Sequence, residues 1–252
     1  MSILIKPAYD ADASTYFTTA GVTSTAGRQQ ISRFVTGIKN LGLYNNMVCW
    51  PLRSSQNAGT GTTAYSLGGL ATYNGTLVNS PTWGTDGLIN SATGRITTSY
   101  FSPSGSQTHI FVGNSGAGGG DRAYANTLAL NGSTWSGFVF RDNGAYYGAG
   151  ASQFIQTVRD LTSAGNFKMA AALFNNPASS YTYLNTTQGN IGAGGAMLVS
   201  PTAMTIMSVS SSQYFVGTAS FYGTFVAELT TSQYTSIYTL YKTTLGAGLG
   251  LP

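Results

Sequence analysis

Charged side chains are scarce in this sequence. Only 7% of the 252 residues are Asp, Glu, Lys or Arg, against about a quarter in a typical globular domain. Eleven basic residues outnumber seven acidic ones, which gives a net charge of +4. The basic residues are scattered and form no run, so the sequence lacks the concentrated positive patch by which proteins hold nucleic acid. We therefore expect no nucleic-acid partner.

Reactive side chains are equally few, with one cysteine, Cys49, and one histidine, His109. A single cysteine excludes an intramolecular disulfide, and a zinc site needs three or four His, Cys or carboxylate ligands. Cys49 lies in the apolar run 47–50 and is predicted to be a buried thiol. A Ser-His-Asp triad would have to use His109, but His109 lies in the alternating segment 108–112, and no G-x-S-x-G motif accompanies it. We interpret His109 as structural.

The acids do not form a catalytic pattern either. A glycoside hydrolase needs two carboxylates that flank the scissile bond, and the E-x-D-x-x-E strand of jelly-roll glucanases is absent. The acids are Glu228 and six aspartates: Asp10, Asp12, Asp86, Asp121, Asp142 and Asp160. We therefore expect no enzymatic activity and keep a glycoside hydrolase as the second alternative. We expect no cofactor, although Asp121, or Asp142 with Asn143, could bind calcium through loop oxygens.

Long hydrophobic runs are missing as well. The first fourteen residues, MSILIKPAYDADAS, lack the apolar core of a signal peptide, and no window approaches the roughly 20 apolar residues of a membrane span. We therefore expect a protein made in a cytoplasm, with no signal peptide, no transmembrane segment and no membrane partner.

Short apolar groups separated by turn-forming residues dominate what is present. In the segment 73–101, YNGTLVNSPTWGTDGLINSATGRITTSYF, four turn signals interrupt the apolar positions. Asn-Gly and Asp-Gly pairs suit tight connections between antiparallel strands. The same pattern predicts strands at 47–52, 64–67, 76–79, 95–101, 107–113, 124–130, 135–141, 144–149, 152–158, 167–174, 180–185, 203–209 and 220–228. Without helices between the strands, the pattern indicates an all-β, antiparallel jelly-roll sandwich.

Helices are predicted only near the two ends of the chain. Residues 1–46 are expected to form an extended arm, with Ile3, Leu4 and Ile5, followed by helices at about 10–20 and 25–41. Residues 47–252 are expected to form the jelly-roll domain. Its closing amphipathic helix, 231–245, begins with the capping-box pattern of Thr230 and Gln233. The apolar stripes of the second and third helices predict that both pack on the β domain.

Three segments carry a resemblance to a known family. They are YNGTLVNSPTW (73–83), FYGTFVAELTTSQYTSIYTLYKTTLG (221–246), and a lead-in with DADASTYFTTAG followed by LGLYNN and MVCWPL. Together they resemble the laminin-G/concanavalin A-like jelly rolls of structural proteins in tailed bacteriophages. Relatives often carry an F-D-G-x-x-D-Y-V-like strand after the Trp segment, whereas this chain has LINSATGR at 88–95. The segment 102–220 agrees in pattern only.

The resemblance implies a non-enzymatic virion structural protein, such as a capsid decoration, head-fibre or tail-associated subunit. Its partners would be other virion proteins, and it would form a homo-oligomer, for which a trimer is a working assumption. Its location would be the virion, after synthesis in the host cytoplasm. As a further hypothesis, the lead-in 1–24 reaches outward to a neighbouring subunit or to the shell.

The first alternative is a carbohydrate-binding module for host-surface glycans. Sugars stack on exposed aromatic rings and accept or donate hydrogen bonds with nearby amides and carboxylates. The candidate residues are Trp135, Tyr146, Tyr147, Asn131, Asp142 and Asn143. Trp135 could instead fill the core of the sandwich, and Tyr146 and Tyr147 are neighbours on a predicted strand and so face opposite sides.

Overall fold

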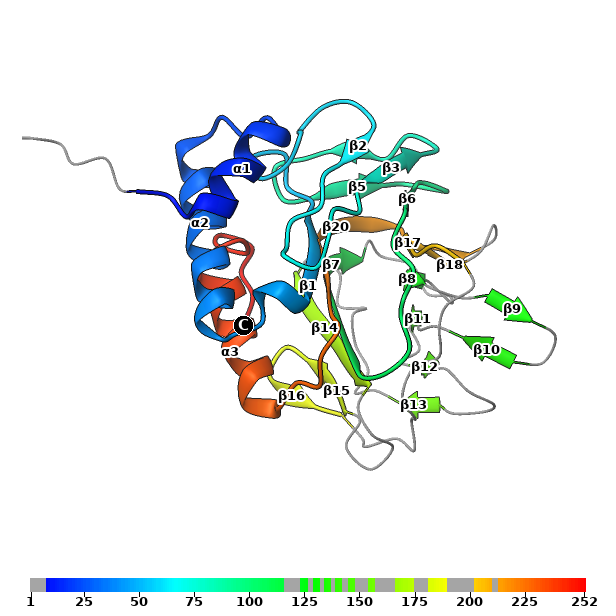
Figure 1. The fold of residues 1–252 in the computed structure, drawn as a ribbon. Coiled ribbons are helices and arrows are strands. Elements are labelled where there is room, and N and C mark those ends of the chain that lie inside the picture. Colours follow the sequence, from blue (N-terminus) through cyan, green and yellow to red (C-terminus); the bar gives the residue numbers. More distant parts are fainter. Residues whose placement is uncertain are drawn as a thin grey trace, which may run out of the picture.

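A computed structural model describes residues 8–115, 166–174, 181–189, 202–209 and 213–252, and the backbone alone of six short strands between 123 and 156. In these residues two antiparallel β-sheets lie face to face, and three helices cover the outer face of the larger sheet (Figure 1). The predicted antiparallel sandwich with helices near both ends is confirmed.

The larger sheet has eight strands in the order β16-β15-β14-β7-β20-β5-β4, with β1 also paired to β20. Its strands are β1 (Met47–Pro51), β4 (Thr82–Trp83), β5 (Leu88–Asn90), β7 (Gln107–Ser115), β14 (Lys168–Phe174), β15 (Tyr181–Leu184), β16 (Thr187–Gln188) and β20 (Gly217–Phe225). Strand β20 is central because its first half pairs with β5 and its second half with β1, while β7 lies along its other side.

The second sheet has six strands in the order β11-β8-β17-β6-β3-β2. These are β2 (Thr63–Ala64), β3 (Gly75–Val78), β6 (Arg95–Thr98), β8 (Ala123–Asn126), β11 (Val139–Arg141) and β17 (Thr205–Ile206). Three two-stranded ladders join β9 (Ala129–Asn131) to β10 (Thr134–Ser136), β12 (Ala145–Tyr147) to β13 (Phe154–Gln156), and β18 (Ser208–Val209) to β19 (Gln213–Tyr214).

The segment 73–101 contributes strands to both sheets. It runs from β3 in the second sheet to the β4–β5 hairpin in the larger sheet and returns to β6. Asn79 and Ser80 adopt positive φ at the first crossing, and Asp86-Gly87 closes the hairpin as the Asp-Gly signal predicts. A Cβ on Gly87 would lie 2.2 Å from the backbone oxygen of Ala219. Glycine therefore lets the hairpin turn pack against β20.

Side chains alternate along the strands of the larger sheet, so each of its faces covers a separate core. On β7, Ile110 and Val112 join the core beneath the helices, whereas Phe111 joins the core between the sheets. This alternation of apolar residues on β7 explains how one sheet packs against two layers. On β20 a bulge between Ala219 and Phe221 shifts the register of its pairing with β7.

Local capping fixes the helix boundaries. Helix α1 (Ala11–Thr19) begins at Asp10, whose side chain accepts hydrogen bonds from two backbone N–H groups. Helix α2 (Thr25–Asn40) is followed by the 3-10 turn η1 (Tyr44–Asn46). Helix α3 (Thr231–Thr243) starts with the predicted capping box of Thr230 and Gln233. It ends two residues before the predicted boundary, because Thr244 leaves the helical conformation at φ −121° and ψ −98°.

The predicted apolar stripes of α2 and α3 both face the larger sheet and are buried. Phe34 and Ile38 on α2, and Tyr234 and Tyr241 on α3, lie in the core beneath the helices. A Cβ on Gly37 would lie 2.5 Å from the side chain of Leu240, so glycine allows α2 and α3 to approach closely. None of the described helices is long and apolar enough to cross a membrane.

A buried arginine joins the end of α3 to the sandwich. Arg53 donates hydrogen bonds from Nη1 to the carbonyl oxygens of Leu245, at 3.0 Å, and Ala247, at 2.8 Å. Gln56 donates a second bond to the Leu245 oxygen at 2.8 Å. Both carbonyls belong to the turn that follows α3, so Arg53 and Gln56 tie this turn to the sandwich.

Candidate functional site

A shallow polar groove lies where α1, η1 and the loop 66–74 meet. It consists of two adjoining hollows of about 170 and 250 Å³ that share Asp12 and Tyr44; we call it the Tyr44 groove. Its polar lining consists of Asp12, Thr15, Thr19, Lys39, Tyr44, Asn45, Ser66, Thr72 and Asn74. Hydroxyl, amide and ring groups on a concave surface are the groups that hold a small polar ligand.

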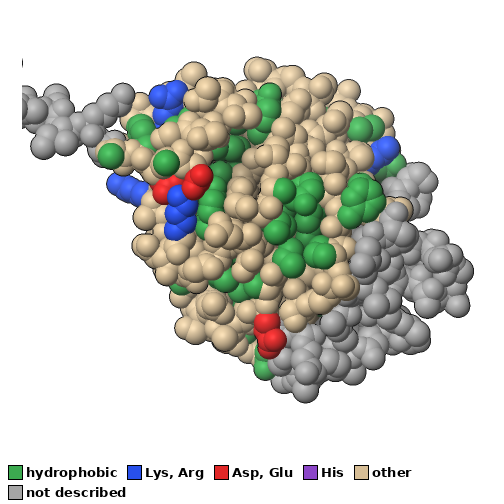
Figure 2. All heavy atoms as spheres, in the orientation of Figure 1, with side chains coloured by type: hydrophobic (Ala, Val, Ile, Leu, Met, Phe, Trp, Pro, Cys, Tyr) green, Lys and Arg blue, Asp and Glu red, His purple; other side chains and the backbone are tan. Residues whose placement is uncertain are grey.

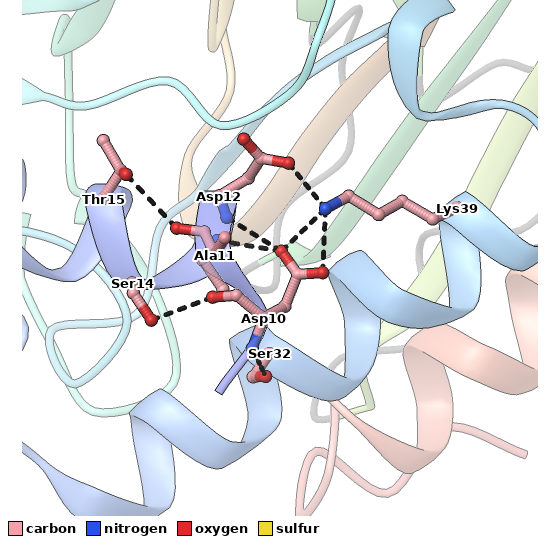
Figure 3. A network of polar contacts seen from close by, with 8 residues as sticks. Asp10, Ala11, Asp12, Ser14, Thr15, Ser32 and Lys39 are labelled. Carbon is pink, nitrogen blue, oxygen red and sulfur yellow. Dashed lines mark hydrogen bonds and ion pairs between the residues drawn. The ribbon is translucent and has the colours of Figure 1, made fainter. Parts of the chain in front are cut away.

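Two helix ends position the charged side of the Tyr44 groove (Figure 3). Lys39 extends from the last turn of α2, and its Nζ lies 2.9 and 2.8 Å from the two carboxylate oxygens of Asp10. The same ammonium pairs with Asp12 in the first turn of α1. It also lies 5.0 Å from the centre of the Tyr44 ring, a cation–π distance. Lys39 therefore joins both helices to η1.

These contacts fix the charge state of the groups. Burial raises the pKa of Asp10, but the hydrogen bonds from Lys39 and the backbone outweigh it, so the pKa lies below its ordinary value. For Lys39, burial lowers the pKa, but the carboxylates of Asp10 and Asp12 outweigh this effect, so the pKa lies above its ordinary value. Burial, together with the charge of Asp12, raises the pKa of Tyr44. At neutral pH the ion pair is complete and Tyr44 is a neutral phenol.

Hydrogen-bonding capacity remains on the groove surface. The Tyr44 hydroxyl has no hydrogen-bond partner among the described residues, and the side chain of Asp12 is 51% exposed. The side-chain Oδ1 of Asn74 accepts a hydrogen bond from the backbone N–H of Ser66 at 3.0 Å, which orients the Asn74 amide. The groove can therefore accept and donate hydrogen bonds beside an aromatic ring.

The histidine lies elsewhere, in the core between the sheets. His109 on β7 is fully buried. Its Nδ1 lies 2.8 Å from the Tyr222 hydroxyl and its Nε2 lies 3.1 Å from the Gln107 side-chain oxygen. Because that amide oxygen can only accept, the network assigns the proton to Nε2 and makes Tyr222 the donor to Nδ1. The interpretation of His109 as a structural residue agrees with this geometry.

Burial determines the electrostatics of both His109 and Cys49. It lowers the pKa of His109 to about 3, so the imidazole is neutral at physiological pH. Burial also raises the pKa of the fully buried Cys49 thiol, as the prediction of a buried, unreactive cysteine requires.

The described acids form no metal-binding cluster. Among the residues that the structure describes, no group of three or more His, Cys, Asp or Glu side chains could hold a metal ion. Asp10 and Asp12 share Lys39, and Asp86 lies 3.6 Å from Arg53. Asp121, Asp142 and Asp160 lie outside the described residues, as does Asn143 of the calcium hypothesis.

The predicted sugar-binding residues fall in the part of the chain with backbone strands only. Asn131 ends β9 and pairs with Thr134, next to Trp135 on β10. Tyr146 and Tyr147 belong to β12, in a different ladder. Their side chains, and Asp142 and Asn143, lie outside the described residues, so this site stays a prediction.

Comparisons with solved structures agree on the fold. The chain resembles a Trypanosoma rangeli sialidase with a TM-score of 0.54 and 14% identity, over 87% of this chain and 40% of that one. A complex of that enzyme with sialic acid gives a TM-score of 0.51 and 12% identity over the same shares. The binding domain of botulinum neurotoxin serotype D gives 0.52 and 9%, over 79% of this chain and 52% of that one.

At such low identity, these likenesses show a common fold alone. The chain spans 40% of the sialidase chains and about half of the toxin domain. No protein-family model matches the chain, and no curated protein matches it.

Proposed function

We propose that this chain is a non-enzymatic structural subunit of a bacteriophage virion, such as a decoration, head-fibre or tail-associated protein. The observation that supports it is the convergence of the three segments that carry the family resemblance. The lead-in helices and the closing helix pack together on the larger sheet. The Trp50 indole, at the end of the lead-in, donates to the Tyr73 carbonyl at the start of the Trp segment, at 3.0 Å. The three segments that carry the resemblance therefore pack against one another in the folded chain.

The surface composition suits assembly through neutral contacts. Figure 2 shows a face on which charged side chains are sparse and apolar groups are scattered among uncharged polar ones. Ile89 and Phe101 are the large hydrophobic side chains that the described part of the chain exposes, at 45% and 52%. Non-obligate interfaces are about as apolar as ordinary surface and are depleted in charge at their centres. A weakly charged surface of this kind can pack against other virion proteins without strong charge matching.

Quantitative mass spectrometry of purified, salt-washed particles tests the proposal. We expect the chain at a fixed copy number per particle, in a multiple of the symmetry of the structure that carries it. Surface contacts of low charge should survive high salt, because salt screens ion pairs and leaves apolar burial intact. Purified virions that lack the chain would contradict the virion role.

A second candidate function is glycan binding at the Tyr44 groove. The groove brings a phenol ring, an exposed carboxylate and an amide together on a concave surface. The sandwich also resembles a sialidase solved with sialic acid and the binding domain of a neurotoxin. Here the ring of Tyr44 would stack on the sugar, and Asp12 and Asn74 would bond its hydroxyl groups. As part of a virion, this site would contact the host surface.

Binding to a glycan array, followed by titration of any hit, tests this site. Tyr44→Ala should weaken binding by about tenfold or more, equivalent to about 1.4 kcal/mol, because the stacking surface is lost. The matched control, Tyr44→Phe, keeps the ring and should retain most of the affinity. An array without hits, or a hit that Tyr44→Ala binds equally well, would count against this candidate.

A further inference from the structure

The charged side of the Tyr44 groove carries an excess of negative charge. Lys39 pairs with Asp10 at 2.8 Å and with Asp12 at 2.5 Å, and Figure 3 shows its ammonium between the two carboxylates. Two carboxylates and one ammonium leave a net charge of −1. Among the described residues that line either hollow, the charged ones are Asp12 and Lys39, so no second cation there offsets this charge.

Asp12 presents the excess charge to solvent. Its Oδ2 takes the Lys39 ammonium, and 51% of its side chain is exposed. Its Oδ1 makes no hydrogen bond within the described part of the chain and points away from Lys39 in Figure 3. A carboxylate oxygen can only accept hydrogen bonds. Asp12 therefore suits a ligand that brings hydroxyl donors and repels a ligand that brings a second carboxylate.

The remaining polar groups of the groove are uncharged. The backbone N–H of Ser66 occupies the Oδ1 of Asn74, which leaves the amide N–H groups of Asn74 to donate. The hydroxyls of Tyr44 and Thr72 can both donate and accept. One carboxylate acceptor among neutral donors is a set that matches the hydroxyl groups of an uncharged sugar.

Backbone hydrogen bonds fix the loop 66–74 on one side of the groove. Leu67 exchanges two hydrogen bonds with Cys49 on β1, at 2.7 and 2.8 Å, and the Gly69 N–H donates to the Tyr44 carbonyl at 3.0 Å. The loop is therefore held against both β1 and η1, and its position does not depend on a ligand.

Helix α1, on the other side of the groove, is held by its own buried face. Ala13, Tyr16 and Phe17 lie in the core beneath the helices, and the Tyr16 hydroxyl donates to the Gln56 carbonyl at 3.0 Å. This part of the lead-in therefore does not reach outward, as the sequence hypothesis stated. Because both sides of the groove are held by the folded chain, a ligand needs to order little of the protein on binding.

The size of the groove restricts the ligand further. The hollow that contains Asp12, Tyr44 and Asn74 has a volume of about 170 Å³, below the roughly 300 Å³ at which pockets for drug-sized ligands begin. A hollow of this size suits one sugar ring, with the rest of a glycan continuing into the adjoining hollow or into solvent.

We propose that the Tyr44 groove binds an uncharged sugar ring and discriminates against sugars that carry a carboxylate. Hydroxyl groups of the sugar donate to Asp12 Oδ1 and accept from the Asn74 amide, while the ring packs on Tyr44. A carboxylate in the same place meets the unbalanced negative charge. The inference rests on the glycan-binding candidate proposed above, and it names the class of sugar.

Titration of the full chain with matched methyl glycosides, followed by NMR chemical shifts, tests this class. The methyl glycosides of glucose, galactose and mannose are each compared with the corresponding uronic acid glycoside, in which a carboxylate replaces the CH₂OH group. We expect a neutral member to bind about fivefold or more tightly than its uronic acid partner at low salt, because this is the factor for two like charges about 4 Å apart in water. The preference should shrink in about 1 M salt, where charges are screened within about 3 Å.

A pair of charge-removing variants locates the origin of the preference. Asp12→Asn keeps the shape of the side chain and removes its charge, so it should reduce the preference to about twofold or less. The matched control, Asp86→Asn, removes the same charge from an aspartate that is 55% exposed and lies beside Arg53, and should keep the wild-type preference. A uronic acid glycoside that binds as tightly as its neutral partner, or no binding of any neutral glycoside, overturns the inference. An equal preference in the two variants also overturns it.

Failure of this inference and failure of glycan binding give different results. If the array shows acidic glycans whose binding is lost in Tyr44→Ala, the groove binds glycans and the assigned class of sugar is wrong. If neither the array nor the neutral glycosides bind, the glycan-binding candidate fails together with this inference.

Discussion

His109 illustrates how a side chain with catalytic potential can be structural. Its two ring nitrogens are bonded to Tyr222 and Gln107, and burial keeps its pKa near 3. An unfolded chain would bind a proton at this residue with a pKa of about 6.5. Native and unfolded chains therefore bind different numbers of protons between these two values, and the free energy of unfolding depends on pH there.

We predict that stability falls as the pH is lowered from about 6.5 toward 3, by up to about 1.4 kcal/mol per pH unit from this residue. Stability falls toward low pH because the pKa of His109 is lower in the native chain, so the unfolded chain takes up the proton first. His109→Gln should remove this slope and lower stability at pH 7.5 by about 1–3 kcal/mol. Urea unfolding at pH 7.5, 6 and 5 measures both effects. Equal slopes in the two proteins would contradict the assignment.

At the scale of the element, the Asp10 carboxylate does two things for α1. It caps the first turn by accepting from the N–H groups of Asp12 and Ala13, and it joins α1 to α2 through Lys39. Asp12, in contrast, makes a more exposed ion pair with the same lysine, with 51% of its side chain accessible. Exposed pairs contribute little, whereas a cap contributes about 0.5–2 kcal/mol.

We therefore predict that Asp10→Ala lowers the free energy of unfolding by about 1–2 kcal/mol, and that Asp12→Ala costs less than about 1 kcal/mol. Asp10→Asn should recover most of the loss, because asparagine also caps helices. The lowered pKa of Asp10 adds stability above about pH 4 that is lost as the pH falls through its native pKa. Chemical denaturation of the three variants tests this ranking, and an equal cost for Asp10→Ala and Asp12→Ala would contradict it.

The helices could be predicted closely from the sequence because their signals are local. Asp10, the stripe of α2 and the capping box at Thr230 each lie within a few residues of the boundary that they set. The shortest strands, such as β4 and β5, were not predicted, because two or three residues are too few to show a periodic pattern. The predicted strand 95–101 ends at Thr98, and Tyr100 turns into the core between the sheets.

At the scale of the whole molecule, the sandwich could be predicted from closely spaced turns without intervening helices. The order of strands could not be predicted. Strand β20 pairs with β7 and β5, more than 100 residues earlier in the chain, and no local pattern in the sequence marks which distant strands will pair. The Tyr44 groove was also missed: Asp10 and Lys39 are 29 residues apart and meet only after α1 and α2 pack. No local motif marks such a site.

Electron microscopy of the intact particle tests the central claim, that this chain holds a position in a virion without catalysing a reaction. The account predicts repeated density into which the sandwich and its three helices fit. Particles without such density, combined with hydrolysis of host polysaccharide by the purified chain, would contradict it.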